Sequence, residues 1–90
     1  MSWENETRRI LRAELVRRDV TYARLSSRLR AIGVNETERS IANKMSRGTF
    51  TFVFFLQCMR AIGLQRVTFD IQTPLATGLV EPSATDDETP

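Results

Sequence analysis

Five polar side chains, spaced for one face of a short helix, carry the most specific chemistry in this chain. They are Arg39, Ser40, Asn43, Lys44 and Arg47. An asparagine amide can pair with the edge of adenine, and an arginine fork can pair with guanine or with phosphate oxygens. Helical spacing of these residue types predicts an outward face that contacts double-stranded DNA, and the alternative is an ordinary solvated polar face.

A second group of polar residues stands where predicted helices begin. Thr21 and Tyr22 open a segment that ends at Ile32, and Thr49 shortly precedes one that starts at Phe52. Backbone amides at a helix N-terminus favour a bound phosphate. We therefore expect Thr21, Tyr22 and Thr49 to lie at the same interface, although a simple N-capping role at the helix starts explains each of them equally well.

Apolar periodicity defines the elements that must position these residues. It predicts helices over about Glu4 to Arg18, Tyr22 to Ile32, Glu36 to Arg47 and Phe52 to Ile62. A short turn around Gly33 joins the second and third helices, which is the sequence form of a helix-turn-helix. The predicted fold class is all-α, a compact four-helix domain containing a helix-turn-helix, with a short C-terminal strand or arm and a disordered acidic tail.

Caps and stripes set the limits and buried faces of these helices. Thr21, Asn35 and Thr51 are the expected N-caps, and Glu38 would complete a capping box with Asn35. The expected inward positions are Tyr22, Leu25, Leu29 and Ile32, then Ile41 and Met45, and finally Phe52, Phe55, Leu56, Met59 and Ile62, with Phe54 and Cys58 widening the last face.

The chain divides into three parts by composition. Residues 1–66 form the helix-turn-helix domain, residues 67–72 alternate apolar and polar as in a strand or extended arm, and residues 73–90 read as a flexible acidic tail. A lone strand would leave its backbone groups unpaired, so we expect this segment to pair with a second copy and form a homodimer.

Charge follows the same division. Residues 1–66 contain all 13 Lys and Arg residues and six of the 11 acids, a net charge of +7, whereas residues 67–90 contain the other five acids, a net charge of −5. A basic body with an acidic tail suits a domain that binds a polyanion.

Other function classes find little support in the composition. The chain has no His, and its single Cys58 lies within an apolar stripe, so we expect no enzyme activity, no metal site and no cofactor. No stretch approaches the ~18 apolar residues of a membrane span. The N-terminal residues are acidic and lack an apolar run, so we expect a cytoplasmic protein.

These residues also resemble a known group. Leu25 with Leu29, the turn Gly33-Val34-Asn35, and Arg47-Gly48 are similar to the phage-repressor-like helix-turn-helix domains of the Cro and xenobiotic-response type, over about Ile10 to Ile62. The runs 20–23 and 47–63 look like a family of short bacterial proteins with a domain of unknown function. The resemblance implies a repressor-like bacterial regulator that uses the helix from residue 36 to residue 47 as its recognition helix.

A rival interpretation stays open. The same fold could serve as a protein-interaction module, for example an antiactivator or a partner of a larger regulator. Glu36 and Glu38 favour that rival, because acidic side chains at the leading end of a recognition helix repel phosphate.

Overall fold

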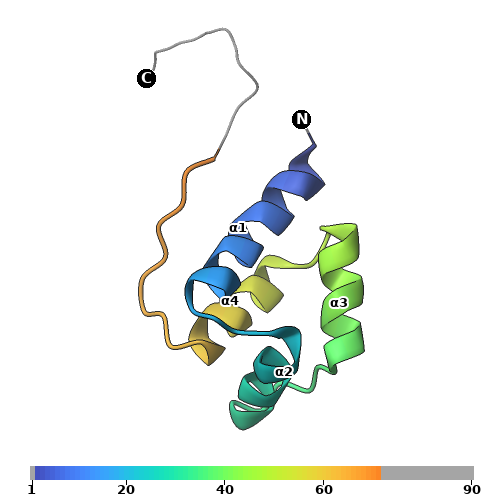
Figure 1. Ribbon diagram of the computed structural model, residues 1–90, viewed down its shortest axis with the longest axis vertical. Coiled ribbons are helices and arrows are strands. Elements are labelled where there is room, and N and C mark those ends of the chain that lie inside the picture. The colour runs from blue at the N-terminus through green and yellow to red at the C-terminus, as the bar shows by residue number, and fades with distance from the viewer. Residues whose placement is uncertain (1, 72–90) are drawn as a thin grey trace, which may run out of the picture.

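The computed structural model describes residues 2–71, which form four helices (Figure 1). These helices are α1 (Trp3–Arg17), α2 (Tyr22–Ala31), α3 (Glu38–Arg47) and α4 (Phe52–Ala61). Helix α2 packs against both α3 and α4, and α1 packs against α3. The predicted all-α, four-helix class is confirmed. The predicted acidic tail, residues 73–90, lies outside the described residues.

A hydroxyl side chain caps the start of every helix. In each case the side-chain oxygen accepts a hydrogen bond from the backbone amide three residues later, which satisfies one of the free amides of the first turn. The four caps are Ser2, Thr21, Thr37 and Thr51. Thr21 and Thr51 were expected in this role, whereas the cap of α3 differs from the prediction.

Helix α3 begins two residues later than predicted. The Ser40 amide donates to the Thr37 hydroxyl at 3.0 Å, and the Thr37 amide donates to the Ser40 hydroxyl at 2.9 Å. This reciprocal capping box replaces the expected pair of Asn35 and Glu38. The Ser26 hydroxyl also donates to the backbone carbonyl of Glu36 at 2.6 Å, which holds that residue in the connection. The turn between α2 and α3 therefore spans residues 32–37, and the prediction of a helix from Glu36 is wrong at its start.

The hydrophobic core lies where the four helices meet. Leu25 and Leu29 of α2 and Ile41 and Met45 of α3 are buried, as their spacing predicted. Ile32, expected on the same stripe, instead follows α2 and is 39% exposed. The remaining core residues are Leu11, Leu15, Val20, Phe54, Phe55, Cys58, Met59 and Ile62.

The buried face of α4 is rotated from the predicted one. Phe52 and Leu56 were expected inside but are 68% and 49% exposed, and Val53 beside them is 62% exposed. Phe54 and Cys58, expected only at the edges of the buried face, lie in the core. An unbroken apolar run from residue 52 to residue 56 gives no phase, so packing against α2 decides which side is buried.

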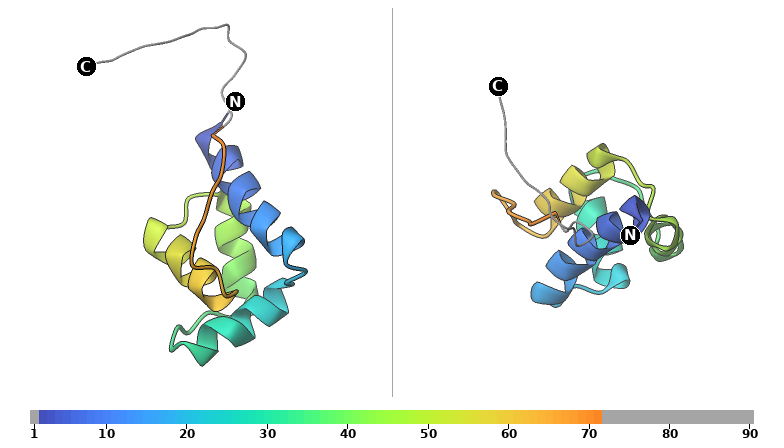
Figure 2. Two further views of the ribbon diagram at one scale, coloured as in Figure 1. Left: turned by 90° about the vertical axis from the view of Figure 1, so that its left-hand side faces the viewer. Right: turned by 90° about the horizontal axis from the view of Figure 1, so that it is seen from above.

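Residues 67–71 form an extended arm and no strand within the described part of the chain. Val67 packs against the core, and the Phe69 ring meets the Phe55 ring edge-on at 6.2 Å between centroids. An Arg9 guanidinium nitrogen donates to the Asp70 carbonyl at 2.7 Å. Figure 2 shows the arm running back along the molecule to the N-terminal end of α1, away from α3. Within this one chain the segment is an arm, because no described residue pairs with it as a strand, and strand pairing with a second copy stays a prediction.

A close contact joins the start of α1 to the end of α3. Gly48 has φ +67°, and a Cβ atom added there would lie 2.5 Å from the Glu4 carbonyl oxygen. Only glycine combines this left-handed backbone with such an approach. Arg8 strengthens the junction by donating to the Ser46 carbonyl and to the Asn5 side chain.

Candidate nucleic-acid interface

Three of the five side chains predicted to face outward form a free stripe along α3. Arg39, Asn43 and Arg47 follow one another at intervals of four residues, and all three are exposed. Within residues 2–71 none of them makes a hydrogen bond or an ion pair. Their donors and acceptors are thus open to solvent or to a ligand. This stripe lies on α3, which Figure 1 places at one side of the domain.

The other two predicted side chains, Ser40 and Lys44, belong to an internal network. The ammonium group of Lys44 lies 3.1 Å from both carboxylate oxygens of Glu36 and 5.3 Å from the centroid of the Phe54 ring. The Ser40 hydroxyl lies 2.7 Å from the same carboxylate and also completes the cap of α3. Ser40 and Lys44, also predicted to face outward, are thus half-buried and engaged with Glu36, and their contacts with DNA stay a prediction.

This network changes the local charge at the start of α3. Glu36 is mostly buried, with 15% of its side chain exposed, and its carboxylate is paired with Lys44. The negative charge of Glu36 is therefore balanced within the network. Glu38 remains exposed in the first turn, so only one of the two acids that would repel a phosphate stays at the surface.

The predicted contacts outside α3 have mixed surroundings. Thr21 is exposed and accepts from the Arg24 amide at 3.1 Å, so its hydroxyl is occupied as a cap. Tyr22 is half-buried, and its hydroxyl accepts from Arg12 at 3.4 Å. Thr49 is exposed directly after α3 and has no hydrogen-bond partner within the described range. Of these three, Thr49 continues the polar surface beyond Arg47.

The arginines divide into engaged and free groups. On α1, Arg9 pairs with Glu6 at 2.7 Å and Arg17 pairs with Glu14 at 2.6 Å, while Arg8 contacts the end of α3. On α2, Arg28 and Arg30 are exposed and have no partner among residues 2–71. The charge available to an external anion therefore lies on α2 and α3 more than on the first part of α1.

Comparison with protein families matches residues 3–67 to a domain of unknown function, DUF6471. This span begins with α1, contains all four helices and reaches the first residue of the arm. The chain belongs to the DUF6471 family. Comparison with curated proteins and with solved structures found no match. The family description assigns no chemistry to the DUF6471 domain, so a function has to be argued from its surfaces.

Other kinds of site find no support in this DUF6471 domain. Burial raises the pKa of the Cys58 thiol to about 12, and the Glu36 carboxylate adds to the rise, so the reactive thiolate is suppressed. No group of three or more His, Cys, Asp and Glu side chains gathers among residues 2–71. None of the helices in that range is long and apolar enough to cross a membrane.

Sequence reasoning missed two features of the DUF6471 domain. The first is the network of Glu36, Ser40, Lys44 and Phe54, which depends on Glu36 lying in the turn and not in the helix. The second is the exposed apolar side of α4. The sequence did contain a signal for the second feature, because residues 48–59 include no charged residue. A helix with one side exposed to water normally carries charged residues on that side.

Proposed function

We propose that this protein is a cytoplasmic, sequence-specific DNA-binding transcriptional regulator of bacterial type, with α3 as its recognition helix. The observation that carries the proposal is the stripe of Arg39, Asn43 and Arg47, three long polar side chains that are exposed and unpaired on one helix face within the described residues. In a helix-turn-helix pair, the second helix enters the major groove and its exposed side chains read base edges.

Each residue of the stripe has a definite role in this proposal. Asn43 pairs with adenine through its amide, and Arg39 pairs with the acceptor atoms of guanine. Arg47 and Thr49, at the end of α3, contact phosphate, as do Arg28 and Arg30 of α2. Lys44 acts indirectly, because it neutralises Glu36 and so lowers the repulsion that an approaching phosphate meets.

The test is a binding site selected from random duplexes, followed by titration of variants. Arg39→Ala and Asn43→Ala should each weaken binding to the selected site by about 1–3 kcal/mol and leave affinity for unrelated duplex DNA much less changed. Their thermal midpoints should stay close to that of the wild type, since both side chains are exposed.

Arg60→Ala is the matched control. It removes the same charge from the exposed surface of α4, away from the stripe. Its affinity for the selected site should fall only slightly, through the loss of one general positive charge. Wild-type affinity for the selected site in both Arg39→Ala and Asn43→Ala would refute the assigned face.

A second candidate function is a protein-interaction module. The observation that favours it is the exposed apolar side of α4, with Glu38 at the start of α3. Salt separates the two candidates, because binding to random duplex DNA should weaken steeply as salt rises if the domain neutralises phosphates. Undetectable binding to any duplex at low salt would favour the interaction module.

A further inference from the structure

An uncharged, exposed apolar surface joins α4 to the arm. Phe52, Val53 and Leu56 of α4 and Phe69 of the arm are between 43% and 68% exposed, and we call these four residues the apolar face. The Phe55 ring connects its two halves, since it lies 5.9 Å from the Phe52 ring and 6.2 Å from the Phe69 ring. Exposed apolar residues grouped in this way mark an interaction surface more often than scattered ones do.

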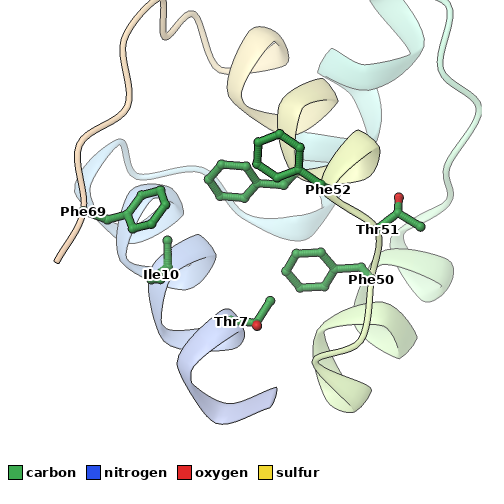
Figure 3. A pocket seen from close by; sticks show the side chains of 7 residues that line it. Thr7, Ile10, Phe50, Thr51, Phe52 and Phe69 are labelled. Carbon is green, nitrogen blue, oxygen red and sulfur yellow. The ribbon is translucent and has the colours of Figure 1, made fainter. Parts of the chain in front are cut away.

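A groove opens beside the apolar face. Its volume is about 270 Å³, and its walls come from Ile10 of α1, from Phe50, Phe52 and Phe55 at and before the start of α4, and from Phe69. Figure 3 shows these side chains converging from three separate segments of the chain. An apolar cavity of about 150 Å³ already accommodates a benzene ring, so this groove has room for an aromatic or branched side chain.

We propose that a second copy of this chain docks on the apolar face, each copy placing apolar side chains of α4 against the groove of the other. A two-fold interface brings the same patch of both subunits together, so it needs a surface that offers both a projecting and a receiving part. Phe52 lines the groove, and both Phe52 and the next residue, Val53, are mostly exposed, so the apolar face offers both parts.

Charge favours a second copy as the occupant. Residues 1–66 carry a net charge of +7, so contact between the helical domains of two copies is opposed wherever their Lys and Arg side chains meet. Residues 48–59 contain no Lys, Arg, Asp or Glu, so contact here meets the least repulsion. An acidic partner would need cations within the contact, and the apolar face contains none.

The position of the arm suits the proposed function. Figures 1 and 2 place the arm on the side of the domain away from α3, so a partner seated over Phe69 leaves the stripe of α3 open. The biological role of this dimer rests on the proposed function, because dimers of helix-turn-helix proteins bind paired half-sites on DNA. It replaces pairing of residues 67–71 as strands, since Phe69 packs on Phe55 of its own domain.

The test measures the mass of the full chain in solution without DNA, by sedimentation across the micromolar range. The wild type should be a dimer that dissociates on dilution, and Val53→Asp should raise the dissociation constant by at least about tenfold because the charge loses its water in the contact. Val16→Asp is the matched control. Val16 is 72% exposed on α1, outside the apolar face, and its replacement should leave the dimer intact.

A second measurement guards against misfolding of the Asp variant. Leu56→Cys introduces an exposed thiol, and Cys58 does not compete because it is fully buried. Mild oxidation should yield a covalent dimer from Leu56→Cys far faster than from Val16→Cys, with unchanged helical circular dichroism.

Three results would overturn the inference: a monomeric wild type at high micromolar concentration, a Val53→Asp variant that remains as dimeric as Val16→Asp, or equal cross-linking of the two Cys variants. If the wild type is monomeric, the double variant Leu75→Asp, Leu79→Asp tests whether the chain's own C-terminal residues cover the face instead. DNA is absent from these measurements, so a dimer without DNA affinity would refute the proposed function and not the dimer surface.

Discussion

Helices α3 and α4 have the same construction and opposite exposed surfaces. Each has ten residues and a threonine as its N-cap, and a glycine with positive φ lies one or two residues after its last residue. Each also buries one apolar stripe in the shared core. On their outer sides, α3 presents the polar stripe of Arg39, Asn43 and Arg47, whereas α4 presents Phe52, Val53 and Leu56.

The difference separates the requirements of folding from those of binding. The buried halves of both helices are explained by packing, since each fills the core beside α2. The exposed halves lie outside that core, apart from the contact of the Phe52 ring with Phe55, and a folded domain would accept ordinary solvated residues there. An unpaired polar stripe on one helix and an uncharged apolar side on the other therefore suit the two partners proposed above, an anionic one for α3 and an apolar one for α4.

The strongest test of this separation compares the two sides of α4. Met59→Ala should lower the free energy of unfolding by about 2–5 kcal/mol, because the side chain is 3% exposed and its loss leaves a cavity. Leu56→Ala removes a comparable side chain from the exposed side and should cost less than about 1 kcal/mol. Urea denaturation at low protein concentration checks both values, and equal losses would mean that the outer side of α4 also supports the fold.

The glycines that follow the two helices give the next largest contrast. Gly48→Ala should destabilise the domain by about 2–4 kcal/mol, because it adds a left-handed alanine and a clash with the Glu4 carbonyl. Gly63 has φ +86°, but a Cβ atom added there would meet nothing within 4 Å among the described residues, so Gly63→Ala should cost only about 1–2 kcal/mol.

Thermal denaturation of the two Gly variants provides the measurement. A Gly48→Ala variant no less stable than Gly63→Ala would show that the junction of α1 and α3 yields easily, and the end of α3 would then be a poor anchor for a rigid recognition surface.

The smallest expected effect concerns the internal network of α3. Glu36→Gln should cost about 0.5–1.5 kcal/mol of stability, since the amide oxygen still accepts a hydrogen bond from Ser40 or Lys44 and only the charge of the acceptor is lost. It also frees Lys44 to contact a phosphate, which should steepen the dependence of log affinity on log salt by up to about 0.9.

Glu38→Gln is the control for this change. It removes an equal charge from the start of α3 but releases no cation, because Glu38 has no ion-pair partner in the described part of the chain. Filter binding over a salt series should therefore show the steeper slope for Glu36→Gln alone. Identical slopes for the two variants would mean that Lys44 stays in place without its acid.

The sequence predicted the helices where periodicity was unambiguous. Leu25 and Leu29, and Ile41 and Met45, lie at spacings that fit only one helical face, and all four are buried. The face of α4 could not be predicted in the same way, since residues 52–56 are all apolar and their period carries no phase. The buried side of α4 is determined by its contacts with α2, and a local sequence pattern does not contain that information.

The start of α3 shows a similar limit. Asn35 with Glu38 and Thr37 with Ser40 both satisfy the local rule for a capping box. Tertiary contacts exclude the first pair, because Ser26 holds the Glu36 carbonyl and Lys44 holds its carboxylate. The outward placement of Arg39, Asn43 and Arg47 was predictable from helical spacing, whereas the contact of Lys44 with Glu36 depends on those same tertiary contacts. That Arg39, Asn43 and Arg47 contact DNA stays a prediction.

The hydroxyl caps have a consequence for acid conditions. An aspartate cap loses its charged acceptor as its carboxylate takes up a proton near its ordinary pKa of about 4, and the helix start weakens with it. Serine and threonine hydroxyls do not titrate in that range. The four capping oxygens of this domain, on Ser2, Thr21, Thr37 and Thr51, therefore accept the same hydrogen bonds in acid as at neutral pH.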